Sequence, residues 1–234
     1  MGSSRKQGNR RRQFLIFSVL LSGSFCLYIQ LIRLGYAVPL PYLLHVFCWN
    51  NCSDNRYSNH LHSKVPGNGL LNYRSYLTQL VDSQAIDKNK VSILIEKSRY
   101  RLTVYYDKKP LKSYPVVLGF NSVDDKLKEG DGSTPEGIFK IKDLYTHPTW
   151  SKFLWLDYPT KDSWRKHIKA KGNGKINWLD SIGGQVGIHG VPDEQDFLIE
   201  RRSNWTLGCI SLKNRDIEEL YQVVKKGTEV EIIQ

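Results

Sequence analysis

Cys209 and His189 are the two residues of this sequence whose types and surroundings are suited to nucleophilic catalysis. A thiol becomes a strong nucleophile when a neighbouring base takes its proton, and a neutral imidazole is such a base. His189 ends a predicted strand and has glycines on both sides, in the stretch GQVGIHGVP. Cys209 follows Gly208 later in the chain, where a strand is expected to pass into a helix. The pair predicts an acyl-transfer site.

The backbone around the two residues is suited to the same chemistry. Glycines beside His189 allow a substrate backbone to approach closely. Peptide N–H groups in a turn near a helix N-terminus can hold a developing oxyanion, which favours the turn at Gly208 and Cys209. On these residues alone other interpretations stay open: Cys209 as a buried spacer, half of a disulfide or a metal ligand, and His189 as a structural residue of a strand.

Residues 91–234 resemble the L,D-transpeptidase catalytic domain, the YkuD-like family. The hallmark of that family is a His-Gly pair at a strand end followed by Ser/Thr-x-Gly-Cys, matched here by His189-Gly190 and Thr206-Leu207-Gly208-Cys209. The family's upstream motifs are matched by SYPVVLG (113–119) and STPEGIFKI (133–141). The stretch KLKEGDGSTPEG (126–137) resembles the longer form found in one branch of the family.

The resemblance implies a mainly β, β-sandwich-like fold with a few helices, acting on peptidoglycan stem peptides without a metal or cofactor. Cys209 would attack the carbonyl that joins the L-centre of diaminopimelate to the terminal D-Ala. His189 would accept the thiol proton and return it to the leaving amine, and the carbonyl of Gly190 would orient the imidazole. The N–H groups of Gly208 and Cys209 would form the oxyanion hole, and Thr206 would shape the loop.

Several outcomes of this chemistry stay open. An acceptor amine would give a 3-3 crosslink or a protein–peptidoglycan link, whereas water would make the protein an L,D-carboxypeptidase. Many family members carry Arg two residues after the cysteine, but this chain has Ser211, as does the branch in which hydrolytic members occur. A sortase-like transpeptidase would need a downstream catalytic Arg on a strand, and only Arg215 is available, at the start of a helix. A non-catalytic wall-binding protein would not need both His189 and Cys209.

The elements expected to position these residues are strands and one amphipathic helix. Apolar, β-branched and aromatic runs predict strands, the first three as an antiparallel meander. Apolar residues at helical spacing predict a closing helix with Lys225 and Lys226 in its last turn and Gly227 as its terminator, and a short helix over Leu70–Val81. The expected strands are 91–96, 101–106, 111–119, 137–145, 184–190 and 228–233; the apolar face of the closing helix is Ile217, Leu220, Tyr221 and Val224.

A long segment, residues 145–179, carries four tryptophans: Trp150, Trp155, Trp164 and Trp178. Long segments between elements often cover active sites, so this one predicts a lid or substrate wall. The alternative is that the tryptophans fill a local core.

The N-terminal arm predicts export. Five basic residues precede Phe14–Ile32, a 19-residue stretch without charge, close to the length that crosses a bilayer as a helix. Positive residues stay in the cytoplasm, so the catalytic domain is expected on the far side of the membrane, in the periplasm or extracytoplasmic space. A cleaved signal peptide and a buried core helix are the alternatives. Three regions follow: a basic tip and signal-anchor helix (1–35), a linker with a short helix (36–90), and the catalytic domain (91–234).

Two further features of the arm bear on partners. Cys48 and Cys52 are spaced for a small disulfide loop in an oxidising compartment; the alternatives are two unpaired thiols in a linker and a zinc site that uses His60 and His62. The net charge of +11 comes mostly from residues 1–90, with 11 Lys and Arg against 3 Asp and Glu, whereas residues 91–234 have 23 against 20. Because no nucleic-acid-binding motif accompanies this charge, the sequence predicts no nucleic-acid partner.

Overall fold

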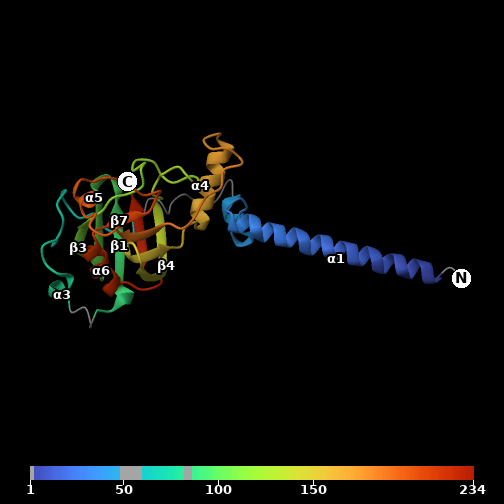
Figure 1. The fold of residues 1–234 in the computed structure, drawn as a ribbon, viewed down its shortest axis with the longest axis horizontal. Helices are drawn as coiled ribbons and strands as arrows, with labels where there is room; N and C mark the ends of the chain where they lie inside the picture. The colour runs from blue at the N-terminus through green and yellow to red at the C-terminus, as the bar shows by residue number, and fades with distance from the viewer. Residues whose placement is uncertain (1–2, 48–59, 82–85) are drawn as a thin grey trace.

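The computed structural model describes residues 3–47, 60–81 and 86–234 (Figure 1), with the side chains of the N-terminal helix described from Phe17 onward. The fold is mainly β with several helices, as the sequence predicts. One long helix, α1 (Ser3–Arg33), extends away from a body that contains the described strands. The body is the part of the molecule that positions the candidate site.

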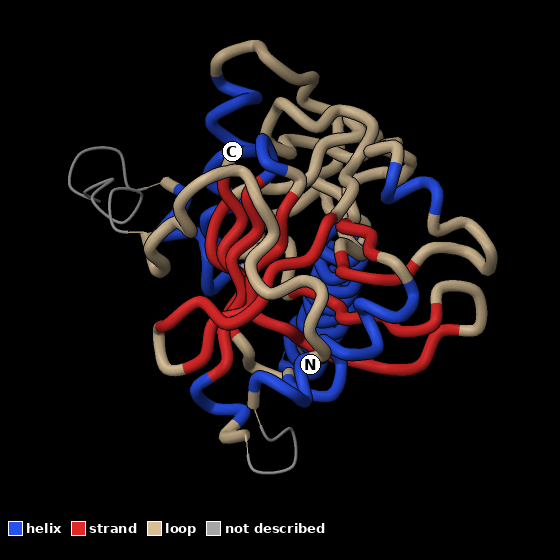
Figure 2. Tube along the Cα trace, turned by 90° about the vertical axis from the view of Figure 1, so that its left-hand side faces the viewer, coloured by secondary structure: helices blue, strands red, loops and turns tan. Residues whose placement is uncertain are grey.

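The described strands form one eight-stranded sheet in the order β3-β2-β1-β8-β4-β5-β6-β7, at the centre of the body (Figure 2). The pairs β1/β8 and β6/β7 are parallel, and the other neighbours are antiparallel. The expected antiparallel meander is therefore confirmed for the first three strands. The strands are β1 (Val91–Glu96), β2 (Arg101–Tyr106), β3 (Lys109–Pro115), β4 (Gly137–His147), β5 (Ser151–Leu156), β6 (Gly187–Gly190), β7 (Ile210–Leu212) and β8 (Glu229–Ile233).

Most of the helices other than α1 are short. The helix that follows β7 in the chain is the one that supports the site. The helices are α2 (Leu43–Val46), α3 (Leu77–Leu80), α4 (Lys161–Gly172), α5 (Phe197–Glu200) and α6 (Asn214–Val223), with 3-10 turns at Leu40–Tyr42, Lys88–Lys90 and Lys97–Arg99.

Strands β1 and β2 are rich in apolar residues, and both of their faces are covered. In β1 five of six residues are buried, and its partner β2 also has five buried residues. Ile93 pairs with Val104 and Ile95 with Leu102, and all four side chains are fully buried. β-branched and large apolar side chains pack well on such a pleated surface, so these runs form strands.

The sheet is continuous and curls back on itself at β4, so that its two halves contribute to one core cluster. Strand β4 is long enough to pair with β8 through Gly137–Lys140 and then with β5 through Ile141–His147. The chain just after β3 meets β7, where Val117 and Ser211 exchange backbone hydrogen bonds of 3.0 and 2.9 Å. The two ends of the sheet therefore meet close to the candidate site.

Helix α6 packs against β5 and β6 and so supports the strand that carries His189. Of the predicted apolar face, Ile217 and Leu220 are buried in the helix, Tyr221 is half-buried and Val224 lies just past the helix end, while Val223 is buried in addition. The helix ends at Val223, so the prediction that Lys225 and Lys226 lie in its last turn is wrong. The reason is that Val224 adopts an extended conformation and is itself buried, which takes the chain out of the helix toward β8.

The helix predicted over Leu70–Val81 is also wrong in extent, because only α3 (Leu77–Leu80) is helical. The carbonyls that precede it are used by the sheet instead. The guanidinium of Arg101 donates to the carbonyls of Gly67 and Gly69 at 3.0 and 2.9 Å, and the N–H of Ser113 donates to the carbonyl of Leu71 at 2.9 Å. These tertiary hydrogen bonds outweigh a helical spacing of apolar residues.

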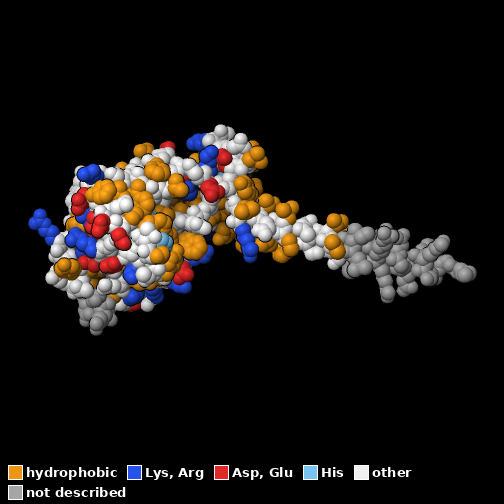
Figure 3. Space-filling view, in the orientation of Figure 1, with side chains coloured by type: hydrophobic (Ala, Val, Ile, Leu, Met, Phe, Trp, Pro, Cys, Tyr) orange, Lys and Arg blue, Asp and Glu red, His pale blue; other side chains and the backbone are white. Residues whose placement is uncertain are grey.

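The expected membrane segment, Phe14–Ile32, lies within α1, and the side chains of residues 14–16 fall outside the described set. From Phe17 onward its apolar side chains are largely exposed, as Figure 3 shows. Across the described part of the chain, no helix is both long enough and apolar enough to span a bilayer.

The chain that follows α1 packs onto the body. Val38 and Val46 belong to the main core cluster, and the carbonyl of Gly35 accepts a 3.0 Å hydrogen bond from the N–H of Ile182. Helix α2 lies against α4, near the body end of α1 (Figure 1). Cys48 and Cys52, with the disulfide expected between them, lie outside the described residues.

Candidate active site

Neighbouring strands carry the two predicted catalytic residues. His189 lies in β6, and Cys209 immediately precedes β7, which pairs with β6 in parallel. The prediction that Cys209 precedes a helix is corrected: a three-residue strand follows it, and α6 begins only at Asn214. Pairing of Ile210 with Ile188 and of Ser211 with His189 makes this segment extended.

Both side chains line one cavity of about 500 Å³. Thr206 and Gly208 line it as well, so four of the five predicted site residues meet there. Gly190, the fifth, is not among the described lining residues and lies behind His189 in β6.

The imidazole of His189 is held in one orientation. Its Nδ1 lies 2.7 Å from the carbonyl oxygen of Gly190, and because a carbonyl only accepts, Nδ1 carries the proton and Nε2 is the basic nitrogen. The ring stacks on Trp150 with centroids 4.4 Å apart, and Phe153 and the edge of Trp205 lie at 5.7 and 5.6 Å. This burial lowers the pKa of His189 to about 4, so the ring is neutral at neutral pH.

Gly190 is required where it stands. A Cβ there would lie 2.1 Å from the side-chain oxygen of Asn214 and 2.6 Å from the carbonyl oxygen of Trp150. The N–H of Gly190 donates to that Trp150 carbonyl at 3.0 Å. Its own carbonyl accepts from His189 and, at 3.2 Å, from the hydroxyl of Ser211. Ser211, which stands where many family members carry Arg, therefore faces inward and is fully buried.

The thiol of Cys209 is uncharged in the resting site. Burial raises its pKa, and an N–H from Gly187 and the positive charge of Lys126 oppose that rise only in part. The sulfur lies 3.6 Å from the carbonyl oxygen of Gln185, which it can reach as a weak donor. Gln185 has a φ of 57°, a strained conformation for this residue type that recurs at functional sites.

The Thr206–Cys209 loop has its own hydrogen bonds. The Thr206 hydroxyl donates to the carbonyl of Cys209 at 2.7 Å and accepts from the N–H of Gly208 at 3.2 Å. Gly208 has a φ of 138°, and a Cβ there would lie 2.7 Å from the carbonyl oxygen of Ser133, so only glycine fits. The Gly208 N–H expected to bind an oxyanion is thus already engaged by Thr206.

The four tryptophans of residues 145–179 have different surroundings. Trp150 lines the cavity and stacks on His189, as a substrate wall requires. Trp164 is buried in the core, whereas Trp178 is 66% exposed. The segment contains β5 and α4, so it is largely regular structure. Sequence reasoning missed Trp205, which directly precedes the hallmark motif and also lines the cavity.

The histidines considered for zinc are used differently. Nδ1 of His60 and Nδ1 of His62 lie 3.0 and 2.9 Å from the two carboxylate oxygens of Glu231. Among the residues that the structure describes, no group of three metal-ligating side chains is arranged to hold an ion.

Comparisons with known proteins indicate the family to which this chain is similar. Residues 90–232 match the family model of the L,D-transpeptidase catalytic domain, YkuD. A curated relative, "Probable L,D-transpeptidase YcfS" of Escherichia coli (strain K12), is 29% identical over 175 residues, which cover 68% of this chain and 49% of that protein. The present chain thus spans about half the length of this relative.

Two solved structures are also similar to this chain. The helical cell shape determining protein Pgp2 from Campylobacter jejuni is 25% identical, with a TM-score of 0.45, over 68% of this chain and 54% of that one. An L,D-transpeptidase from Mycobacterium smegmatis is 15% identical, with a TM-score of 0.41, over 62% and 59%. The family match covers more than half of the sequence and confirms the resemblance drawn from its motifs: the chain belongs to the L,D-transpeptidase catalytic domain family.

Proposed function

We propose that this protein is a cysteine-dependent acyltransferase for peptidoglycan stem peptides, with Cys209 as nucleophile and His189 as base. The observation that carries the proposal is the neutral imidazole of His189, fixed by the carbonyl of Gly190 in the cavity that Cys209 also lines. Membership in the family indicates the substrate class, and the residues that line the cavity indicate the chemistry.

The reaction begins with proton transfer coupled to attack. Nε2 of His189 takes the proton of the Cys209 thiol as the sulfur bonds to the carbonyl carbon between diaminopimelate and D-Ala. The tetrahedral intermediate collapses, the C–N bond breaks, and His189 returns the proton to the leaving D-Ala amine. The stem peptide is then a thioester on Cys209, and an acceptor amine attacks it to form the new amide and release the thiol.

The pKa directions decide between two resting states of this pair. An ion pair would need a Cys209 thiol with a lowered pKa beside a histidine with a raised one. Instead, burial raises the pKa of the thiol and lowers that of His189 to about 4. We infer that the pair rests neutral and that His189 acts as a true general base during attack.

Hydrolysis of the thioester is the second candidate activity, and Ser211 is the residue that favours it. Its side chain is buried and bonded to Gly190, so it offers no cation to a substrate where many relatives carry Arg. Water in place of the acceptor amine would resolve the same thioester and release a free carboxylate. The protein would then be an L,D-carboxypeptidase.

We further propose that residues 1–35 hold the domain at a membrane and leave it on the extracytoplasmic side. Support comes from the basic residues before Phe14 and from the exposed apolar side chains of Phe17, Leu21 and Phe25 on α1. An alkaline phosphatase fusion after residue 60 is expected to be active. An inactive fusion with normal expression would contradict export.

The experiment that tests the activity is product analysis of purified tetrapeptide muropeptides by mass spectrometry. Loss of D-Ala with formation of a dimer indicates transfer, and loss of D-Ala with gain of water indicates hydrolysis. Cys209→Ala is expected to abolish both products while its circular dichroism and thermal unfolding match the wild type. Full turnover by a folded Cys209→Ala protein would exclude the mechanism.

A further inference from the structure

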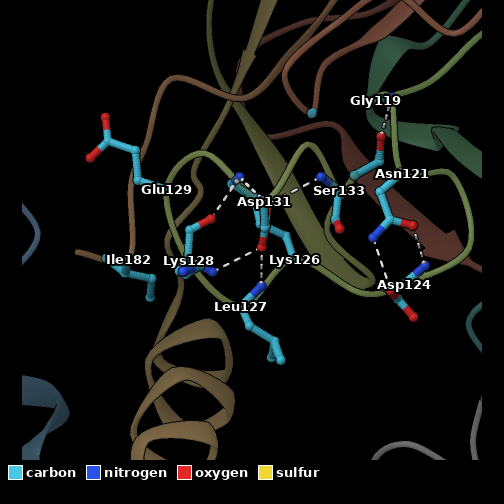
Figure 4. A network of polar contacts seen from close by, with 12 residues as sticks. Gly119, Asn121, Asp124, Lys126, Leu127, Lys128, Glu129, Asp131, Ser133 and Ile182 are labelled. Atoms are coloured by element: carbon cyan, nitrogen blue, oxygen red, sulfur yellow. Dashed lines mark hydrogen bonds and ion pairs between the residues drawn. The ribbon is translucent and has the colours of Figure 1, made fainter. Parts of the chain in front are cut away.

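Lys126 is a charged residue of the cavity that the proposed mechanism leaves unused. It is the only lysine or arginine among the described residues that line the cavity. Its side chain is only 4% exposed, and its ammonium donates to the carboxylate of Asp131 at 2.9 Å and to the carbonyl of Lys128 at 3.1 Å (Figure 4). A buried lysine that faces a cavity requires an explanation, because burial of a charge is costly unless the charge is compensated.

The loop that carries the EGDG motif holds this ammonium in place. The carboxylate of Asp131 accepts from the N–H groups of Leu127, Lys128 and Ser133 at 2.7, 2.9 and 3.1 Å, in addition to Lys126 (Figure 4). Burial raises the pKa of Asp131, but these N–H groups and the ammonium outweigh it and leave the pKa lowered. Asp131 is therefore ionised, and Lys126 has a fixed anionic partner.

The ammonium lies next to the backbone that precedes the nucleophile. A Cβ built on Gly208 would be 3.7 Å from Nζ of Lys126, so the charge lies beside the residue before Cys209. Its charge also acts on Cys209 in the direction that favours the thiolate. The sequence separates Lys126 and Cys209 widely, and only the fold brings them together.

The reaction creates negative charge on reacting atoms that are uncharged in the resting site. As attack proceeds, His189 takes the thiol proton and becomes an imidazolium, and negative charge passes from the sulfur of Cys209 to the attacked carbonyl oxygen. Of the two N–H groups that the family resemblance assigns to the oxyanion, those of Gly208 and Cys209, the first is already bonded to Thr206. Preorganised positive charge aimed at a developing anion is a strong source of rate enhancement in a site that excludes water.

We propose that Lys126, fixed by Asp131, supplies the positive charge that stabilises the anion formed on Cys209 and on the attacked carbonyl. This assignment rests on the proposed function. It gives the EGDG motif a physical role, because Asp131 of that motif anchors the lysine. The assignment also separates two uses of the Lys126 ammonium. Stabilising the reacting centre lowers the activation barrier of the reaction, whereas binding a carboxylate of the bound stem peptide would change only KM.

Two neutral variants test the proposal. Lys126→Met removes the charge and leaves Asp131 with its three backbone N–H donors, and Lys126→Gln keeps an amide that can donate to the same acceptors. Lys126→Arg retains the charge. The matched control is Lys128→Met, because the Lys128 side chain pairs with Asp180 at 3.0 Å outside the cavity and its backbone carbonyl is unchanged.

The first measurement needs no turnover. Iodoacetamide alkylation of Cys209 is followed against pH by mass spectrometry of its peptide in the full chain, after thermal unfolding has identified the folded variants. We expect the neutral variants to react about tenfold more slowly at pH 7 and to need a higher pH for half-maximal rate. Lys126→Arg and Lys128→Met should stay within about threefold of the wild type. Unchanged alkylation in a folded neutral variant would overturn the proposal.

The second measurement uses the muropeptide reaction. We expect kcat to fall by about tenfold or more in the neutral variants while KM changes little. An increase in KM with kcat unchanged would mean that Lys126 binds a substrate carboxylate, and it would also overturn the proposal. If the wild type itself fails to process muropeptides, the proposed function fails, whereas the alkylation result still decides the role of Lys126.

Discussion

The carbonyl oxygen of Gly190 lies 2.7 Å from Nδ1 of His189, the residue directly before it in the chain. A backbone carbonyl here takes the place that a carboxylate occupies in a Ser-His-Asp triad. It orients the ring without adding a negative charge, and its hydrogen bond offsets only in part the burial that lowers the pKa of His189 to about 4. The site therefore holds a weak, neutral base beside an uncharged thiol.

Gly190→Ala is expected to unfold more easily and to lose activity. Its Cβ would overlap Asn214 and the carbonyl of Trp150, so β6 must shift and carry the His189 ring with it. Overpacking of this kind costs about 2 kcal/mol of unfolding free energy, which urea denaturation can measure. Gly172→Ala, at the end of α4 with open space around it, is the control and should leave stability unchanged or slightly higher. Equal stability of the two variants would refute the packing argument.

The stability of the folded chain should fall as the pH is lowered from about 6.5 to 4. The pKa of His189 is about 4 in the folded protein and 6.5 when the ring is solvated, so the unfolded chain binds the proton first. Above pH 6.5 the ring is neutral in both states and contributes no slope. Over the window the loss is on the order of 3 kcal/mol from this residue.

The measurement compares urea unfolding of the wild type and of His189→Asn between pH 4 and 8. The difference between the two curves isolates His189 from other groups that titrate in the same range, including Glu231, whose pKa is lowered although burial opposes the shift. Parallel curves for wild type and His189→Asn would show that the imidazole is not buried as a neutral base.

Much of the fold follows from local sequence patterns. The runs that become β1 and β2 are rich in apolar, β-branched and aromatic residues, which suits strands covered on both faces. The face of α6 follows from the spacing of Ile217 and Leu220. The helix expected over Leu70–Val81 failed because residues distant in sequence bind the backbone there: Ser113 binds the carbonyl of Leu71, and Arg101 binds the carbonyls of Gly67 and Gly69 just before the segment. No local pattern contains that information.

The candidate site is predictable only in part. His189 and Cys209 can be identified because His189 precedes a glycine and Cys209 follows one, each at the end of an element, and because a family motif links them. Trp150 could not be identified as the partner of His189, because their contact depends on the pairing of β5 with β6. Lys126 enters the cavity through a loop whose shape is set by Asp131, and spacing along the chain gives no sign of it.

Ser211 should tolerate loss of its hydroxyl better than enlargement. Ser211→Ala removes one donor from the Gly190 carbonyl, which keeps its bond from His189, so a cost of about 1 kcal/mol and a small fall in turnover are expected. Ser211→Arg would bury a long cation between β6 and β7, where the native side chain is fully buried. Thermal unfolding should rank the proteins as wild type, then Ala, then Arg. An Arg variant as stable as the wild type would mean that this position opens to solvent.

Trp150→Ala should shift the acidic limb of activity toward neutral pH. The indole stacks on His189 at 4.4 Å and keeps water from one face of the ring, so its removal should raise the pKa of His189 from about 4 toward 6.5. Turnover of a tetrapeptide muropeptide at pH 6, relative to pH 8, should then fall several-fold, and the histidine resonance should titrate at higher pH by NMR. Trp178→Ala, at an exposed position, should follow the wild-type profile. If Trp150→Ala keeps the wild-type titration of His189 while remaining folded, then other groups, such as Phe153 and Trp205, suffice to bury the base.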